Sequence, residues 1–211
     1  MHMLKRVISG ISAGLLVSIG GCVFLALAND VQTKFVGAVL FAVALLVICY
    51  RGYSLFTGKV GFMVDDYSKN AWSVLLLGLL GNAIGTVVMG VAVKYAVPAL
   101  SITAKAACEA RLEQELGQSI IRGILCGVLM YLAVVIYRQK NTISGIIYCI
   151  PVFILSGFEH SVADMFYFAV SGIVNVKVFL FIGVIIVSNG LGAVLMALLE
   201  RYGKEVPKDA K

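Results

Sequence analysis

Residues 157–162, with the sequence Gly-Phe-Glu-His-Ser-Val, place an ionisable pair in the middle of a long apolar stretch. An imidazole such as that of His160 can gain or lose a proton near neutral pH. Residues 146–158 before the pair and 162–170 after it are almost wholly apolar. An ionisable pair at membrane depth is costly, and it persists only where it lines a cavity or is buried in protein. We therefore expect a path through the membrane around His160.

The composition predicts a membrane protein. Hydrophobic residues make up 61% of the 211 residues and charged residues 13%, whereas soluble proteins have roughly 25% charged residues. A membrane-spanning helix needs about 20 largely apolar residues. Six windows of that kind are present, at residues 7–28, 34–58, 71–97, 117–137, 143–170 and 177–200. Their connections are short and leave no room for a second domain, so residues 1–211 are predicted to form a single transmembrane domain.

An internal repeat divides the chain. Residues 82–89 and 189–196 both read N-x-[I/L]-G-x-V-[V/L]-M, and a weaker Gly-Ile-x-x-Gly pattern relates residues 10–14 to residues 123–127. The first three windows (about 1–100) therefore correspond to the last three (about 110–203). Because three is an odd number, the second copy must enter the membrane from the opposite side, and such inverted repeats place a substrate site near the midplane.

The middle window of each repeat is interrupted at a matching position. The second window breaks at residues 51–59 and the fifth at residues 157–161, and both segments contain glycine. Paired breaks are a strong indication of a transport site. We expect the backbone N–H groups at each half-helix start to form an electropositive cup for a small anion.

The same residues resemble the formate/nitrite transporter family over nearly the whole chain. The specific parts are Leu55-Phe56-Thr57-Gly58, Arg122-Gly123-Ile124-Leu125-Cys126, and residues 157–166, which are similar to the family motif GFEHSxANMF with one change. The resemblance implies six helices per protomer, an aquaporin-like inverted repeat and a homopentamer with one pore in each protomer. It also implies that His160 is the central pore histidine and that Thr57 faces it.

The resemblance implies further pore residues. An outer hydrophobic constriction falls on Phe41 and Phe153, and an inner one falls on Leu45, Leu55, Phe56 and Met130.

This chain departs from the family pattern at three positions. Members usually carry Asn where it has Gly127 and Asp164, and a basic residue, commonly Lys, where it has Arg111. These departures affect substrate preference more than architecture.

Three residues near the breaks have supporting roles in this interpretation. Glu159 points away from its neighbour His160 on any regular backbone and is interpreted as an anchor of the helix break. Asn82 and Asn189 are expected to donate hydrogen bonds between helices or to the broken backbone. The alternatives are structural: His160 could be a buried histidine tied to the backbone, and the constriction phenylalanines could be packing residues.

The function predicted from these features is passive or proton-coupled passage of small monovalent anions of weak acids, such as formate, nitrite or hydrosulfide. Arg111 would concentrate the anion at a vestibule, and His160 would protonate or stabilise it between the apolar constrictions. The sequence has no ATP-binding motif, and we predict no cofactor, no bound metal and no enzymatic activity. We predict a bacterial-type inner-membrane protein whose termini, including a short C-terminal tail, both lie in the cytoplasm, because Lys and Arg are in excess on that side. Much of the net charge of +6 reflects this excess, so it requires no nucleic-acid partner.

Two other function classes stay open. A membrane enzyme or metal site could use His160 and Glu159, although a catalytic metal normally has three protein ligands. An aquaporin-like channel for small neutral solutes would fit the architecture but needs no ionisable residue at the midplane.

Overall fold

The structure is a computed structural model that describes residues 2–203, and it is all-helical. Its long apolar helices could each cross a membrane, and they are α1 (His2–Leu27), α2 (Val31–Arg51), α4 (Lys69–Ala96), α6 (Leu116–Lys140) and α9 (Val176–Gly203). A further apolar segment is divided into α7 (Ser144–Leu155) and α8 (Ser161–Ser171). The chain is therefore a multi-pass membrane protein.

Both interruptions expected from the sequence are present. After α2 the chain runs through residues 52–55 to the short helix α3 (Phe56–Lys59) and the 3-10 helix η1 (Val60–Val64). After α7 it runs through residues 156–160 to α8. Each interruption contains a glycine in the left-handed region, Gly52 with φ 68° and Gly157 with φ 70°. A residue with a Cβ is strained in that conformation, so glycine is the residue that ends each helix there.

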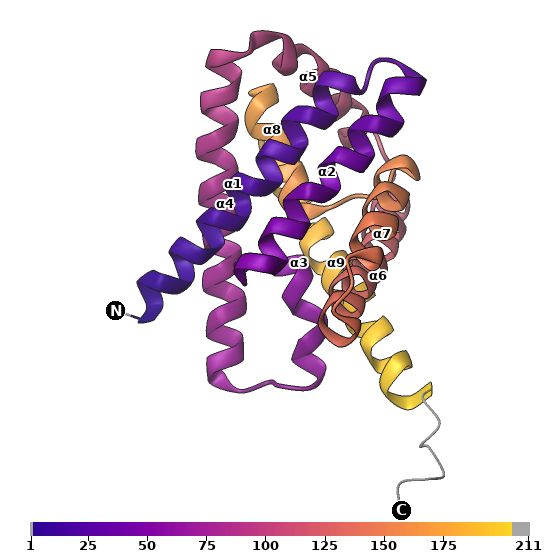
Figure 1. The fold of residues 1–211 in the computed structure, drawn as a ribbon. Helices are drawn as coiled ribbons and strands as arrows, with labels where there is room; N and C mark the ends of the chain where they lie inside the picture. The colour runs from indigo at the N-terminus through magenta and orange to yellow at the C-terminus, as the bar shows by residue number, and fades with distance from the viewer. Residues whose placement is uncertain (1, 204–211) are drawn as a thin grey trace, which may run out of the picture.

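The sequence interpretation missed one helix. The six predicted windows leave residues 98–112 in a connection, but these residues form α5 (Pro98–Leu112), which begins with proline in its first turn. Proline is favoured at the first helical position because its missing N–H would have no partner there. In Figure 1, α5 lies at the top of the molecule, whereas the N-terminal end of α1 and the C-terminal end of α9 lie in the lower half. Helix α5 packs on α8 and positions Arg111.

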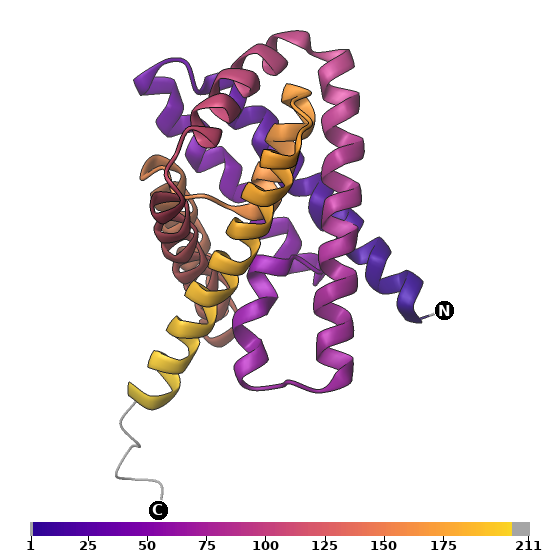
Figure 2. The same cartoon turned by 180° about the vertical axis from the view of Figure 1, so that it is seen from behind.

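Two helix pairs form the frame, and Figures 1 and 2 show them from opposite sides: α1 crosses α4, and α6 packs along α9. Glycines allow both contacts. A Cβ placed on Gly14 would lie 2.6 Å from the carbonyl oxygen of Asn82, and one placed on Gly127 would lie 2.1 Å from that of Asn189. These distances are too short for real atoms, so each of the two helix pairs requires glycine at its point of closest approach. Gly127, where the family usually carries Asn, has a packing role here.

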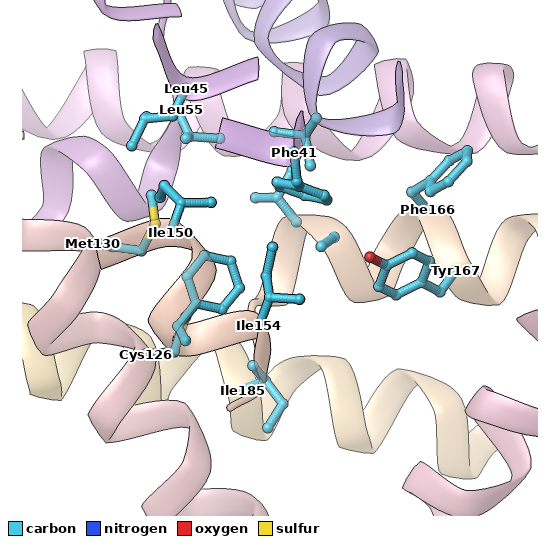
Figure 3. Close-up of a cluster of buried hydrophobic side chains, with 14 of the residues drawn as sticks. Phe41, Leu45, Leu55, Cys126, Met130, Ile150, Ile154, Phe166, Tyr167 and Ile185 are labelled. Atoms are coloured by element: carbon cyan, nitrogen blue, oxygen red, sulfur yellow. The ribbon is translucent and has the colours of Figure 1, made fainter. Parts of the chain in front are cut away.

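The apolar core lies between these two helix pairs. Figure 3 shows part of it, with Leu45, Leu55 and Met130 on one side of Phe41 and Tyr167 on the other. A second, smaller apolar cluster contains Phe56, Leu75 and Tyr131. The breaks in the membrane helices meet within this core, and they position the polar site described next.

Candidate functional site

The first break is held by one asparagine. The Asn82 side-chain Oδ1 accepts a hydrogen bond from the Phe56 N–H at 2.9 Å, and its Nδ2 donates to the carbonyl oxygens of Gly10 at 2.9 Å and Ser54 at 2.8 Å. Asn82 is fully buried. Its amide therefore completes the hydrogen bonds of backbone groups that the break leaves without helical partners.

The second break is held in the same way by Asn189. Its Oδ1 accepts a hydrogen bond from the Ser161 N–H at 2.9 Å, and its Nδ2 donates to the carbonyl oxygens of Gly123 at 2.8 Å and Glu159 at 2.9 Å. Each asparagine thus bonds the first residue of a half-helix, the residue two positions before it, and a glycine of the neighbouring long helix.

His160 and Thr57 meet where the two breaks converge. The His160 Nε2 and the Thr57 Oγ1 are 2.8 Å apart, and both residues are buried. The other ring nitrogen, Nδ1, accepts a hydrogen bond from the Ala163 N–H at 3.1 Å and caps α8. An accepting nitrogen cannot carry a proton, so this contact selects the neutral tautomer with the proton on Nε2. The imidazole therefore presents an N–H donor to the Thr57 hydroxyl.

The electropositive cup expected at the start of α8 is largely closed. Of its first four N–H groups, that of Ser161 bonds Asn189, that of Ala163 bonds the His160 ring, and that of Asp164 bonds the His160 carbonyl oxygen. At the start of α3, the Phe56 N–H bonds Asn82. The Thr57–His160 side chains are therefore the main polar contact that the two breaks offer a small ligand.

Phenylalanine rings lie beside the histidine. Phe153 stacks on His160 with ring centroids 5.6 Å apart, and it meets Phe41 edge to face at 6.3 Å. Leu45, Leu55 and Met130 are buried in the same core cluster as these rings. Phe56, which follows Leu55 in the chain, packs in the second cluster.

Two cavities approach this apolar region. One, of about 330 Å3, is lined by His160, Phe153, Lys34, Arg111 and Asp164, among others. The other, of about 270 Å3, is lined by Leu45 and Leu55 together with Lys59, Arg138 and neighbouring residues. Each cavity thus has both basic side chains and apolar residues of the predicted constrictions in its wall.

Arg111 does line a cavity, but it is not a free cation there. Its Nε donates to the Glu159 Oε2 at 2.9 Å and to the Asp164 Oδ1 at 3.2 Å. Gln114 donates to the other oxygen of Glu159 at 2.8 Å. Glu159 therefore anchors the break twice, through its backbone carbonyl to Asn189 and through its carboxylate to α5. The attraction that Arg111 alone would exert on an anion is offset by these two carboxylates.

No group of three or more metal-ligating side chains forms among residues 2–203. The Glu159 carboxylate is directed to Arg111 and Gln114, while the His160 ring is directed to Thr57 and Ala163. The two residues named for a metal-dependent enzyme therefore have separate partners.

Sequence reasoning did not identify Gln114, Lys34 or the Arg111–Asp164 contact. The relevant signal was the change to Asp164, because a carboxylate within an apolar half-helix requires a partner.

Paired helix breaks around a buried polar pair, with a cavity on each side, define a membrane channel or transporter. Comparison with known proteins gives the family. The family model described as Formate/nitrite transporter matches residues 1–202, and the chain belongs to this family.

Individual relatives agree with this assignment. The chain is 28% identical to "Nitrite transporter NirC" of Salmonella typhimurium over 78% of its own length and 67% of the relative's. It is 27% identical to "Formate channel FocA" of Escherichia coli K12 over 78% of its length and 65% of that protein. The fold matches the solved structure "FNT family ion channel" with a TM-score of 0.83 at 24% identity, covering 96% of this chain and 91% of the other. The chain thus spans about two thirds of the length of these curated relatives.

Proposed function

We propose that the chain conducts small monovalent anions of weak acids, formate, nitrite or hydrosulfide, passively or together with a proton. The observation that carries this proposal is the buried Thr57–His160 pair, 2.8 Å apart, at the point where both helix breaks meet apolar rings. The printed names of the relatives, a nitrite transporter and a formate channel, support the same class of substrate.

Desolvation determines how an anion crosses the apolar region. A bare anion is strongly disfavoured between Phe153 and Leu45, whereas the protonated acid is neutral and small. The Thr57–His160 pair offers a hydroxyl to a passing anion or acid, and the imidazole N–H orients that hydroxyl. Because the Ala163 N–H keeps the ring neutral, His160 acts in this proposal as a hydrogen-bonding partner at rest, and protonation of the ring would require loss of the contact with Ala163.

We further propose an assembly and an orientation. The equivalent bonds of Asn82 and Asn189 support two inverted three-helix repeats in an aquaporin-like arrangement, with α7 and α8 together forming the broken fifth crossing. A homopentamer with one pore in each protomer is supported by the fold match to the solved structure "Pentameric formate channel with formate bound", with a TM-score of 0.68 at 22% identity. Both termini face the cytoplasm of a bacterial-type inner membrane.

Uptake by proteoliposomes tests the function. Purified wild-type protein is expected to take up formate, nitrite or hydrosulfide much faster than acetate and lactate, with uptake rising as the outside becomes more acidic. His160→Asn retains a residue that caps helices well, so it is expected to fold and to show at least about tenfold slower uptake, the effect of one lost hydrogen bond of about 1.4 kcal/mol. If the protein takes up small neutral solutes but none of these anions, the proposal is wrong and the protein is a neutral-solute channel.

A further inference from the structure

A charge cluster with more acids than bases lies beside the cavity at His160, and two of its members, Arg111 and Asp164, line that cavity. The Arg111 Nε lies between the Glu159 Oε2 at 2.9 Å and the Asp164 Oδ1 at 3.2 Å. The neutral amide of Gln114 donates to the other oxygen of Glu159, and Arg111 is the only cation that bonds either carboxylate among residues 2–203. One guanidinium thus serves two carboxylates, and the cluster carries one negative charge when both are ionised.

The second oxygen of Asp164 has no partner among the described residues. Its Oδ2 is buried without a hydrogen bond, and Asp164 is 1% exposed. Glu159 is also buried, at 3% exposed. An ionised carboxylate in such surroundings is strongly disfavoured unless each oxygen is compensated. The free oxygen therefore lacks the donor or positive species that would compensate it in the ionised form.

The surroundings of Asp164 supply no second cation at contact distance. Glu159, Arg111, Cys108, Cys126 and Tyr167 are the ionisable groups that interact electrostatically with it in the described chain. His160 and Lys34 share its cavity, but no ion pair joins either of them to Asp164 among residues 2–203. Arg111 would repel a metal ion at this place, and no metal-binding group of three or more ligands forms among residues 2–203. A proton is the positive species that fits a single buried oxygen.

We propose that the Asp164–Glu159 pair binds one exchangeable proton and thereby controls entry of the anion into the cavity at His160. The proton comes from water in the cavity, binds a carboxylate oxygen and returns to water, and no other bond changes. With the proton bound, the cluster is neutral together with Arg111. Without it, the cluster is negative and repels an incoming anion. This inference rests on the proposed anion conduction.

Asp164→Asn distinguishes this proposal from a purely structural role. The variant keeps the side-chain shape, and it leaves the neutral Arg111–Glu159 pair at every pH. An uncompensated negative charge at the cavity wall disfavours anion entry by about threefold to tenfold after screening. Wild-type uptake is therefore expected to equal that of Asp164→Asn in acid and to fall about threefold to tenfold below it in alkali.

The measurement is formate uptake into proteoliposomes from pH 5 to 9, expressed at each pH as the ratio of wild type to Asp164→Asn at equal amounts of assembled protein. The ratio removes the pH dependence of formate itself, because both proteins see the same concentrations of anion and acid. It is expected to start near one and to decline as the pH rises. The control is Glu109→Gln, which removes an exposed carboxylate from the same helix as Arg111. The ratio of wild-type uptake to Glu109→Gln uptake is expected to stay near one at every pH.

Glu159→Gln provides a second, independent arm. It leaves the neutral Arg111–Asp164 pair, so its ratio curve is expected to follow that of Asp164→Asn, and it keeps the test decisive if one variant fails to assemble. A pH-independent ratio for the variants that assemble would overturn the proton-binding proposal. Absence of anion uptake by the wild type at every pH would instead overturn the proposed function, so the two failures are distinguishable.

Discussion

The two helix breaks share a scaffold but differ in chemistry. At both, an asparagine from a long helix bonds the first N–H of the half-helix and two backbone carbonyls, with partners at equivalent places in the two repeats. The first break continues into a four-residue α-helix and a 3-10 helix, and it contributes the Thr57 hydroxyl. The second continues into the 11-residue α8 and contributes an imidazole and two carboxylates bound to Arg111.

This difference shows which parts of a duplicated fold are free to diverge. The asparagines satisfy backbone groups that exist at any helix break, so both copies need them. The side chains beside the break satisfy no backbone requirement that is common to both copies. The titratable groups are therefore concentrated in one repeat, where α5 supplies a counter-charge, and the other repeat supplies a neutral partner.

The largest expected effect comes from removing the shared anchors. Asn82→Leu and Asn189→Leu would each leave three buried backbone groups without partners, at about 1–3 kcal/mol each. Both variants are expected to lose assembled protein in size-exclusion chromatography, to a similar extent. A stable, wild-type-like assembly from one variant but not the other would show that the two scaffolds are not equivalent.

Helix contacts give the next largest effect. Gly127→Ala and Gly14→Ala would each press a methyl group against a backbone carbonyl that cannot move aside, and overpacking of this kind costs about 1–3 kcal/mol. Both are expected to lower the melting temperature of the purified protein by several degrees. Gly117→Ala, on the same helix as Gly127 but with open space around it, is the control. Retention of the wild-type melting temperature by Gly127→Ala would contradict the close contact of α6 with α9.

The sequence revealed the scaffold better than the polar network. The interrupted second and fifth apolar windows predicted the paired breaks, and the repeated motif predicted the asparagines that bond them, because backbone groups at any break impose the same requirement. The α5 helix was missed because residues 98–112 are too short and polar for a span, and no local pattern indicates what they pack against. The partners of Asp164 were missed because Arg111 lies 53 residues away in the chain, and proximity in space is set by the fold.

Alanine substitutions of Phe41 and Phe153, the residues of the predicted outer constriction, are expected to differ in their effect on selectivity. Phe153→Ala removes both the contact with Phe41 and the stack on His160, whereas Phe41→Ala removes only the first. Both should loosen selectivity toward acetate and lactate by lowering the steric barrier, with the larger change in Phe153→Ala. The measure is the ratio of acetate to formate uptake in proteoliposomes. An unchanged ratio in both variants would assign these rings to packing alone.

Thr57→Val gives the smallest expected effect and tests the first break alone. Valine keeps the volume of threonine but removes the hydroxyl, so the His160 N–H loses its partner at 2.8 Å while its cap on α8 stays in place. Loss of one such hydrogen bond is worth about 1 kcal/mol, which corresponds to an about fivefold slower formate uptake. Thr86→Val, which removes a buried hydroxyl that bonds only its own helix, is the control and is expected to retain wild-type uptake. If both variants slow uptake equally, the effect reflects altered helix packing. If Thr57→Val slows uptake and Thr86→Val does not, the first break contributes the neutral Thr57 hydroxyl of the polar pair, and the second break contributes its titratable partner, His160.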